Sequence, residues 1–287
     1  MYKRQVVVDS TCDFTQDEYK SLDVHMVPLS VLIDGETFKD QFEISSEQFY
    51  ERMAAAENLP QSSQPTPYDF EQMYNALAEK GYDGVIAIHI AGVLSGTIES
   101  SRTAAEQVDI DVRVLDGARA GATAPVALVV EQICKMRDEG ATLDEAEAKA
   151  KELLATAEFL VAPETLENLL KGGRLSADQV KNASLLNIKP IFTFNEKGIL
   201  NAYGKAKGMR GVIKTFVSEV ENRTNEHGVL RIRFCHSGNL KPIEDMKAAL
   251  AEAGIEYIDG GTCPCGAIIS THLGPGALGI GILPANA

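Results

Sequence analysis

The sequence lacks the features that two common classes of binding protein require. Its 287 residues contain 27 Lys and Arg against 41 Asp and Glu, which gives a formal net charge of −14. A nucleic-acid partner requires a basic face that displaces counterions, and adsorption to an anionic membrane requires the same sign of charge. We therefore expect no nucleic-acid partner. No apolar run approaches the ~20 residues of a spanning helix, so we expect no membrane span.

A disulfide framework and a secretion signal are also missing. The five cysteines are an odd number, at positions 12, 134, 235, 263 and 265, and suggest no pairing scheme. Cys263 and Cys265 are one residue too close for a CxxC redox or zinc motif. The segment after Met1 enters an apolar strand without the long apolar region of a signal peptide. These features favour a soluble protein of the reducing cytoplasm.

The usual catalytic motifs are absent as well. The chain has no GxSxG elbow, no Walker loop, no HExxH and no GxGxxG. Its five histidines, at 25, 89, 227, 236 and 272, do not have the spacing of metal ligands. His89 lies within an apolar strand and is expected to be a core histidine, whereas His272 precedes a Gly-Pro-Gly turn and suits a hydrogen-bonding role. We predict no catalytic residue, no metal and no cofactor.

The most informative stretch runs from Asp83 to Val108. An apolar run of strand length is followed by a turn from Gly92 to Thr97 and then by a helix-forming segment. A strand, a Gly/Ser turn and a helix N-terminus together favour an anion, because the amide groups there are unpaired and the helix dipole is positive. Equally, Ser95 or Thr97 could simply be the N-cap of a structural helix.

The chain divides into two patterns. Up to Ala157, strands at 5–9, 24–33, 84–91 and 112–116 alternate with helices, which predicts a mostly parallel sheet covered on both faces. Pro28 marks the 24–33 segment as a single edge or bulged strand. Helix-starting capping boxes stand at Ser45 and Thr142, and Thr66 caps a helix that begins with Pro67.

The second half predicts a mixed sheet with helices on one face. It contains a hairpin over 188–207, then a helix, strand, helix and strand over 211–258, and two closing apolar segments. The fold class is therefore α/β, with a Rossmann-like parallel-sheet domain at 1–157 and a mixed α/β domain at 158–287.

Taken together, the motifs resemble the DegV family of bacterial fatty-acid-binding proteins, over nearly the whole length. The matching segments are Asp9-Ser-Thr11 with Asp13, Ile33-Asp-Gly35, Ile44-Ser-Ser46, Ser62-Ser-Gln-Pro65, Leu94-Ser-Gly-Thr97, Gly173-Arg-Leu-Ser176, Lys189-Pro190 and Thr271-His-Leu-Gly-Pro-Gly-Ala-Leu-Gly279. Ser62 stands where the family usually has Thr, which keeps the hydroxyl.

The resemblance implies a single buried long-chain fatty acid (C14–C18), such as palmitate. Ser62 and Ser95 would hold its carboxylate, with the Gly96 amide helping and His272 close by. It also implies presentation of the acid to a fatty-acid kinase or transfer partner. Arg174, Lys205, Lys207 and Arg210 would then contact the partner or a phosphate.

Two other hypotheses about the function remain open. The fold also resembles the substrate subunit of dihydroxyacetone kinase, in which a histidine carries the substrate covalently, and His272 would be the analogue. That reading predicts a small-molecule enzyme, although the chain has no loop that binds ATP phosphates. Alternatively, the chain is an interaction module in which the lipid is only structural.

Overall fold

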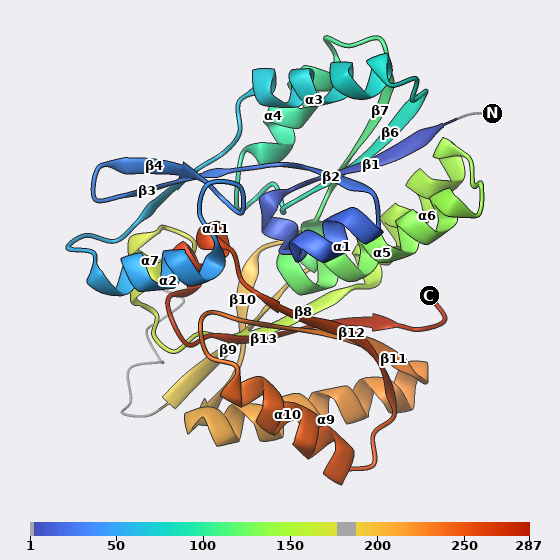
Figure 1. Ribbon diagram of the computed structural model, residues 1–287. Helices are drawn as coiled ribbons and strands as arrows, with labels where there is room; N and C mark the ends of the chain where they lie inside the picture. The colour runs from blue at the N-terminus through green and yellow to red at the C-terminus, as the bar shows by residue number, and fades with distance from the viewer. Residues whose placement is uncertain (1–2, 177–187) are drawn as a thin grey trace.

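The computed structural model describes residues 3–176 and 188–287. Met1, which precedes the predicted first strand, lies outside them. The chain forms two α/β units stacked on one another, one built on a parallel sheet and the other on a mixed sheet (Figure 1). The predicted α/β class, with a Rossmann-like first part and a mixed second part, is confirmed. The domain boundary near Ala157 stays a prediction.

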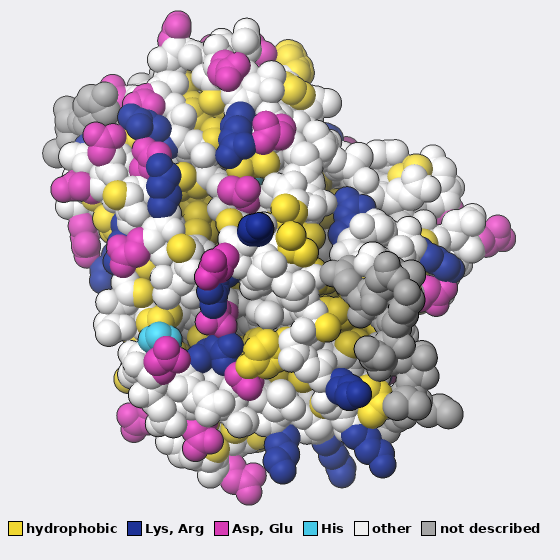
Figure 2. All heavy atoms as spheres, turned by 180° about the vertical axis from the view of Figure 1, so that it is seen from behind, with side chains coloured by type: hydrophobic (Ala, Val, Ile, Leu, Met, Phe, Trp, Pro, Cys, Tyr) yellow, Lys and Arg dark blue, Asp and Glu magenta, His cyan; other side chains and the backbone are white. Residues whose placement is uncertain are grey.

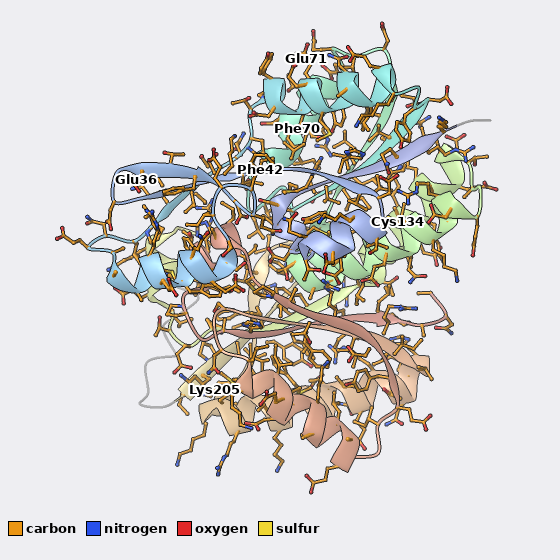
Figure 3. The ribbon with its side chains drawn as sticks, viewed as in Figure 1. Glu36, Phe42, Phe70, Glu71, Cys134 and Lys205 are labelled. Carbon is orange, nitrogen blue, oxygen red and sulfur yellow. The ribbon has the colours of Figure 1, made fainter. Side chains whose placement is uncertain are left out.

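The first sheet has four parallel strands in the order β2-β1-β6-β7. They are β1 (Arg4–Asp9), β2 (Val24–Val27), β6 (Gly84–His89) and β7 (Asp111–Asp116). Helices α3 (Pro67–Glu79) and α4 (Thr97–Ala105) cover one face, and α5 (Thr123–Asp138) and α6 (Leu143–Thr156) cover the other (Figure 1). Phe70 of α3 packs into this core and is labelled in Figure 3.

Local sequence signals set the starts of several helices. Ser45 and Thr142 form complete capping boxes at α2 (Ser46–Ala55) and α6, as predicted. Thr66 caps α3 with Pro67 at its first position, and Thr15 caps the short helix α1 (Gln16–Ser21). Each of these side chains accepts a hydrogen bond from a backbone N–H that the helix itself leaves unpaired.

The prediction of one strand over 24–33 is wrong. The segment forms β2 in the parallel sheet and then β3 (Ser30–Ile33), which belongs to a separate antiparallel sheet of order β4-β3-β5. Pro28 lies between them, where its missing N–H costs no ladder hydrogen bond and the chain leaves one sheet for the other. The partners of β3 are β4 (Glu36–Lys39) and β5 (Gln61–Ser63).

The second sheet has six strands in the order β10-β9-β8-β13-β11-β12. They are β8 (Glu158–Ala162), β9 (Ile188–Phe194), β10 (Leu200–Lys207), β11 (Leu230–His236), β12 (Tyr257–Pro264) and β13 (Leu278–Pro284). The predicted hairpin is confirmed as β9 and β10. β12 continues to Pro264, past position 258 where the predicted strand ends, so Cys263 lies within a strand.

Helices α9 (Gly208–His227) and α10 (Lys241–Glu252) cover the outer face of this sheet (Figure 1). Its inner face meets α5, which packs against both sheets. Gly281 of β13 permits this approach, because a Cβ there would overlap the backbone of Pro125. The remaining elements are the 3-10 turns η1 (Ser10–Cys12) and η2 (Ala118–Ala120) and the helices α7 (Glu167–Lys171) and α11 (Ala267–Leu273).

Within residues 3–176 and 188–287, no helix combines the length and the apolar character needed to cross a bilayer.

Candidate ligand cavity

A cavity of about 300 Å³ lies between the two units. Its apolar wall comes mainly from the second sheet and from the adjoining segments of the first unit. The apolar residues that line it include Ile90, Phe159, Val161, Leu169, Phe194, Leu200, Ile269 and Leu273. The rings of Phe159 and Phe194 stack with centroids 6.2 Å apart. A volume of this size with mostly apolar walls is typical of a small-molecule site.

The predicted carboxylate-binding residues all line this one cavity. Ser62 comes from β5, Ser95 and Gly96 come from the turn before α4, and His272 comes from α11. A hydrogen bond of 2.8 Å joins Ser62 Oγ to His272 Nε2 across 210 residues of sequence. The structure therefore brings these four residues together, and their role in binding a carboxylate stays a prediction.

The turn before α4 differs in detail from the prediction. Neither Ser95 nor Thr97 is the N-cap of α4; Gly96 holds that position and provides no side-chain cap. Ser95 Oγ still accepts a weak hydrogen bond from the Thr97 N–H at 3.3 Å. Gly96 fits because a Cβ there would overlap the Gln64 side chain. The first N–H groups of α4 therefore stand at the cavity without a full side-chain cap.

His272 is held in its neutral form. Burial, and to a smaller extent the nearby Arg174 charge, lower the pKa of His272 to about 4. Its Nδ1 is buried and has no hydrogen-bond partner among the described residues. Gly172 packs directly on the ring, since a Cβ at that position would lie 2.5 Å from Nδ1. A neutral imidazole beside a hydroxyl can hydrogen-bond an anion without adding charge of its own.

Arg174 also lines the cavity, and it brings a positive charge. Its guanidinium donates to the backbone carbonyls of Leu94, at 3.2 and 3.3 Å, and of Gly172, at 2.6 Å. Within the described ranges, no carboxylate pairs with it. A half-buried cation without a protein counter-ion favours an anionic ligand nearby.

The other three predicted basic residues lie elsewhere. Lys205 and Lys207 are on β10 and Arg210 is on α9, all exposed and outside the cavity lining. Lys205 is labelled in Figure 3 beside the lower helices. The face seen in Figure 2 mixes acidic and basic side chains, and basic ones project along its bottom edge, on the side of the lower helices. The sequence grouped these residues with Arg174, and the structure does not.

Of three further buried side chains, one was predicted correctly and two were missed. His89 is fully buried, with Nδ1 3.2 Å from Asp9 Oδ2 and Nε2 2.8 Å from Ser101 Oγ, which confirms the prediction of a core histidine. The aromatic pair Phe159 and Phe194 was missed as cavity lining. Both lie in apolar strands that show no difference between core-facing and cavity-facing residues.

In the part of the chain that the structure describes, no group of three or more His, Cys, Asp or Glu could hold a metal ion. All five cysteines are buried and unpaired.

Comparison with known proteins gives a consistent result. A family model described as "Uncharacterised protein, DegV family" matches residues 3–285. A DegV domain-containing protein of Listeria innocua is 33% identical over 287 residues, with 97% of each chain covered. A Thermus thermophilus structure, described as showing fatty acid binding of a DegV family protein, has a TM-score of 0.91 at 29% identity and covers 98% of this chain and 99% of that one. A Bacillus subtilis structure, described as DegV, a fatty acid binding protein, has a TM-score of 0.86 at 27% identity and covers 99% of both.

Proposed function

This chain belongs to the DegV family, and from that premise we propose that it binds one long-chain fatty acid (C14–C18) without turning it over. The observation that carries the proposal is the cavity itself. Its walls are mostly apolar, and its polar side chains include the Ser62 and Ser95 hydroxyls, the neutral His272 and Arg174. Among the described residues, no carboxylate pairs with Arg174. Related structures described as fatty-acid-binding support the same ligand class.

The polar groups suit a carboxylate. A buried anion is costly unless several hydrogen bonds satisfy it, and hydrogen bonds to a charged group are about twice as strong as neutral ones. Ser62 and Ser95 supply hydroxyl donors, and Gly96, at the N-cap of α4, lines the cavity beside Ser95. Arg174 supplies the balancing charge. We therefore assign Arg174 to the carboxylate of the bound acid, rather than to a partner or a phosphate as the resemblance implied.

The tail supplies most of the affinity. Each buried CH₂ contributes about 0.8 kcal/mol, so a sixteen-carbon chain gains roughly 10 kcal/mol before the costs of ordering. The aromatic and aliphatic residues of β8, β9 and β10 form the apolar surface that such a tail needs. Chain length and saturation then follow from how far the cavity extends beside Phe159 and Phe194.

We also propose that the chain presents its fatty acid to a kinase or transfer partner. Lys205, Lys207 and Arg210 are exposed on β10 and α9, outside the cavity, so they are assigned to docking rather than to the ligand. On a chain with a net charge of −14, three neighbouring basic residues favour an acidic partner surface. Reversing these charges should weaken partner binding and leave fatty-acid content unchanged.

Native mass spectrometry followed by lipid extraction tests the ligand. We compare the wild type with Ser62→Ala and Ser95→Ala, and with Ser218→Ala as a matched control, because Ser218 is exposed on α9 and outside the cavity. We expect one C14–C18 acid per wild-type chain. Loss of one hydroxyl should weaken binding about tenfold or more, with the larger effect for Ser95 at the start of α4.

Two outcomes contradict different parts of the proposal. An empty protein that also fails to bind added oleate or palmitate overturns fatty-acid binding. Equal fatty-acid content in all four proteins leaves binding intact and overturns the assignment of Ser62 and Ser95.

A further inference from the structure

Two buried aspartates hold the first turn of α11. Asp13 follows η1 and Asp40 follows β4, and each side chain is only 1% exposed. Asp13 Oδ1 accepts the Gly266 N–H at 2.9 Å, and Asp40 Oδ1 accepts the Ala267 N–H at 2.8 Å. Both residues come from the first unit, whereas α11 follows β12 of the second sheet. The helix is thus fixed from outside its own sheet.

The two carboxylates are close to each other and incompletely paired. A Cβ at Gly266 would lie within 3.0 Å of oxygens from both of them. The Oδ2 atoms of Asp13 and Asp40 are buried and have no hydrogen-bond partner among the described residues. Gln41 Nε2 donates a hydrogen bond to Asp13 Oδ1 at 3.1 Å, but this uncharged amide does not neutralise the carboxylate. Burial and the repulsion between two neighbouring negative charges favour one proton shared by the pair.

The helix that they hold carries much of the cavity wall. Ile268, Ile269, His272 and Leu273 all line the cavity, and α11 is a single short helix of seven residues. A change in its first turn therefore moves His272 in its last turn. His272 in turn is hydrogen-bonded to Ser62 at 2.8 Å.

We propose that Asp13 and Asp40 are a positioning pair, which holds α11 so that His272 meets Ser62 and which loosens that hold when it takes up a second proton. The inference rests on the proposed function, since it concerns retention of the acid in the same cavity. A neutral carboxyl group accepts a backbone N–H less strongly than a carboxylate does. The two carboxyls stay buried when these hydrogen bonds lengthen, so the loosened arrangement holds the second proton more tightly than the anchored one does. Uptake of the second proton thus weakens the anchor of the helix and speeds release of the ligand.

The pH range follows from the surroundings of the pair. Burial raises the pKa of Asp40 to about 6. Burial, and then the Asp40 charge, raise the pKa of Asp13 well above its ordinary range. Near neutral pH the pair therefore holds one proton, and it takes up the second below about pH 6. The titratable and charged groups that face the pair are Asp9 and Cys12 of the β1–η1 segment, Tyr19 of α1, Tyr50 of α2, Arg233 and Cys235 of β11, Cys263 of β12 and Cys265.

The pair also lowers the stability of the fold at neutral pH, which an uncharged capping residue would not do. Because the folded pKa of each carboxyl is raised, its contribution to stability is complete at low pH and is lost as the pH rises through the folded pKa. At neutral pH an ionised Asp40 thus lowers the free energy of unfolding. An asparagine or serine would accept the same N–H without this cost.

The test measures release of bound palmitate from the full chain between pH 7.5 and pH 5.0. It compares the wild type with Asp40→Asn, and with Asp34→Asn as a control, because Asp34 is an exposed carboxylate in the turn between β3 and β4. We expect the wild-type rate to rise about fivefold, with a midpoint near pH 6, from the loss of one charge-assisted hydrogen bond. Asp34→Asn should behave like the wild type, and the rise should be absent in Asp40→Asn.

Titration of His272 and of the palmitate carboxylate is common to all three proteins, so it cancels in the comparison. Superimposable profiles of the wild type and Asp40→Asn would overturn the inference while leaving fatty-acid binding intact. Failure of all three to retain palmitate at pH 7.5 would instead overturn the proposed function.

A second measurement covers the case in which Asp40→Asn does not fold. The ring resonance of His272 in wild-type protein, assigned by its loss in His272→Gln, should show a step near pH 6, well above the titration of the ring itself. A single transition near pH 4 would mean that α11 does not respond to the pair.

Discussion

Arg233 gives the most direct test of how the two units are joined. It lies on β11 of the second sheet and its side chain is fully buried. Its Nη1 and Nη2 donate to Glu18 of α1 at 2.7 and 2.8 Å, and Nη1 also reaches Glu131 of α5 at 3.3 Å. The change to make is Arg233→Met, which keeps much of the side-chain volume and removes the charge.

The size of the effect follows from what the substitution leaves behind. Breaking a buried ion pair on one side costs about 3–5 kcal/mol, because the remaining charge is uncompensated. The Glu18 and Glu131 side chains are 29% and 20% exposed, so water solvates the remaining charges and reduces this cost. We therefore expect a loss at the lower end, about 3 kcal/mol in the free energy of unfolding.

The loss should also depend on pH. Burial raises the pKa of Glu131 to about 7, and the Arg233 charge opposes that rise. Without Arg233 the pKa of Glu131 goes higher still. A raised carboxyl pKa means that stability is lost as the pH increases through it. Arg233→Met should therefore be more destabilising at pH 8 than at pH 6.

Urea unfolding followed by far-ultraviolet circular dichroism measures both effects, since the chain has no tryptophan. Glu18→Gln, alone and combined with Arg233→Met, completes a double-mutant cycle. We expect a coupling free energy of at least about 1 kcal/mol. A loss below about 0.5 kcal/mol for Arg233→Met, or strictly additive effects in the cycle, would refute the view that this contact joins the units.

Two further predictions concern the cavity. Gly172→Ala places a Cβ 2.5 Å from His272 Nδ1, so it should displace the ring from Ser62 and weaken palmitate binding about tenfold or more. Isothermal titration measures the affinity, and Gly204→Ala is the control, because a Cβ there meets nothing within 4 Å. Equal affinities of the two variants would contradict the packing argument. Because the pKa of folded His272 is lowered to about 4, its contribution to stability is present above the unfolded pKa and is lost as the pH falls toward 4. The urea midpoint of His272→Asn should therefore change less between pH 6.5 and pH 4 than that of the wild type. The same change of midpoint with pH in both proteins would contradict this prediction.

The sequence was sufficient wherever the determinant of structure is local. Capping residues such as Thr66 and Thr142 act on N–H groups only two or three residues away, so their helices could be predicted at the correct starts. The break at Pro28 was misjudged because a proline within an apolar run is compatible with one edge strand or with two strands in different sheets. Only the pairing partners of each half decide between them.

The candidate site depended on contacts that no local pattern contains. Ser62 and His272 are 210 residues apart and meet through the packing of β5 against α11. Their association was predicted only through the family resemblance. Arg233 and Asp40 had no signal at all, because a charged residue in an apolar strand or after a short strand has no visible partner until the two units are stacked.

The cavity is continuous with the hydrophobic core of the second sheet. Its lining residues Phe159, Val161, Leu169 and Phe194 belong to one buried cluster. Apolar surface removed from water stabilises a fold by about 25 cal/mol per Å², so an apolar ligand that covers these walls stabilises the protein. An apolar ligand in the cavity completes the hydrophobic core after the chain has folded. Chains without the ligand unfold more often and are therefore degraded sooner by proteases. We therefore expect the amount of folded protein to rise with the supply of an apolar ligand that fills this cavity.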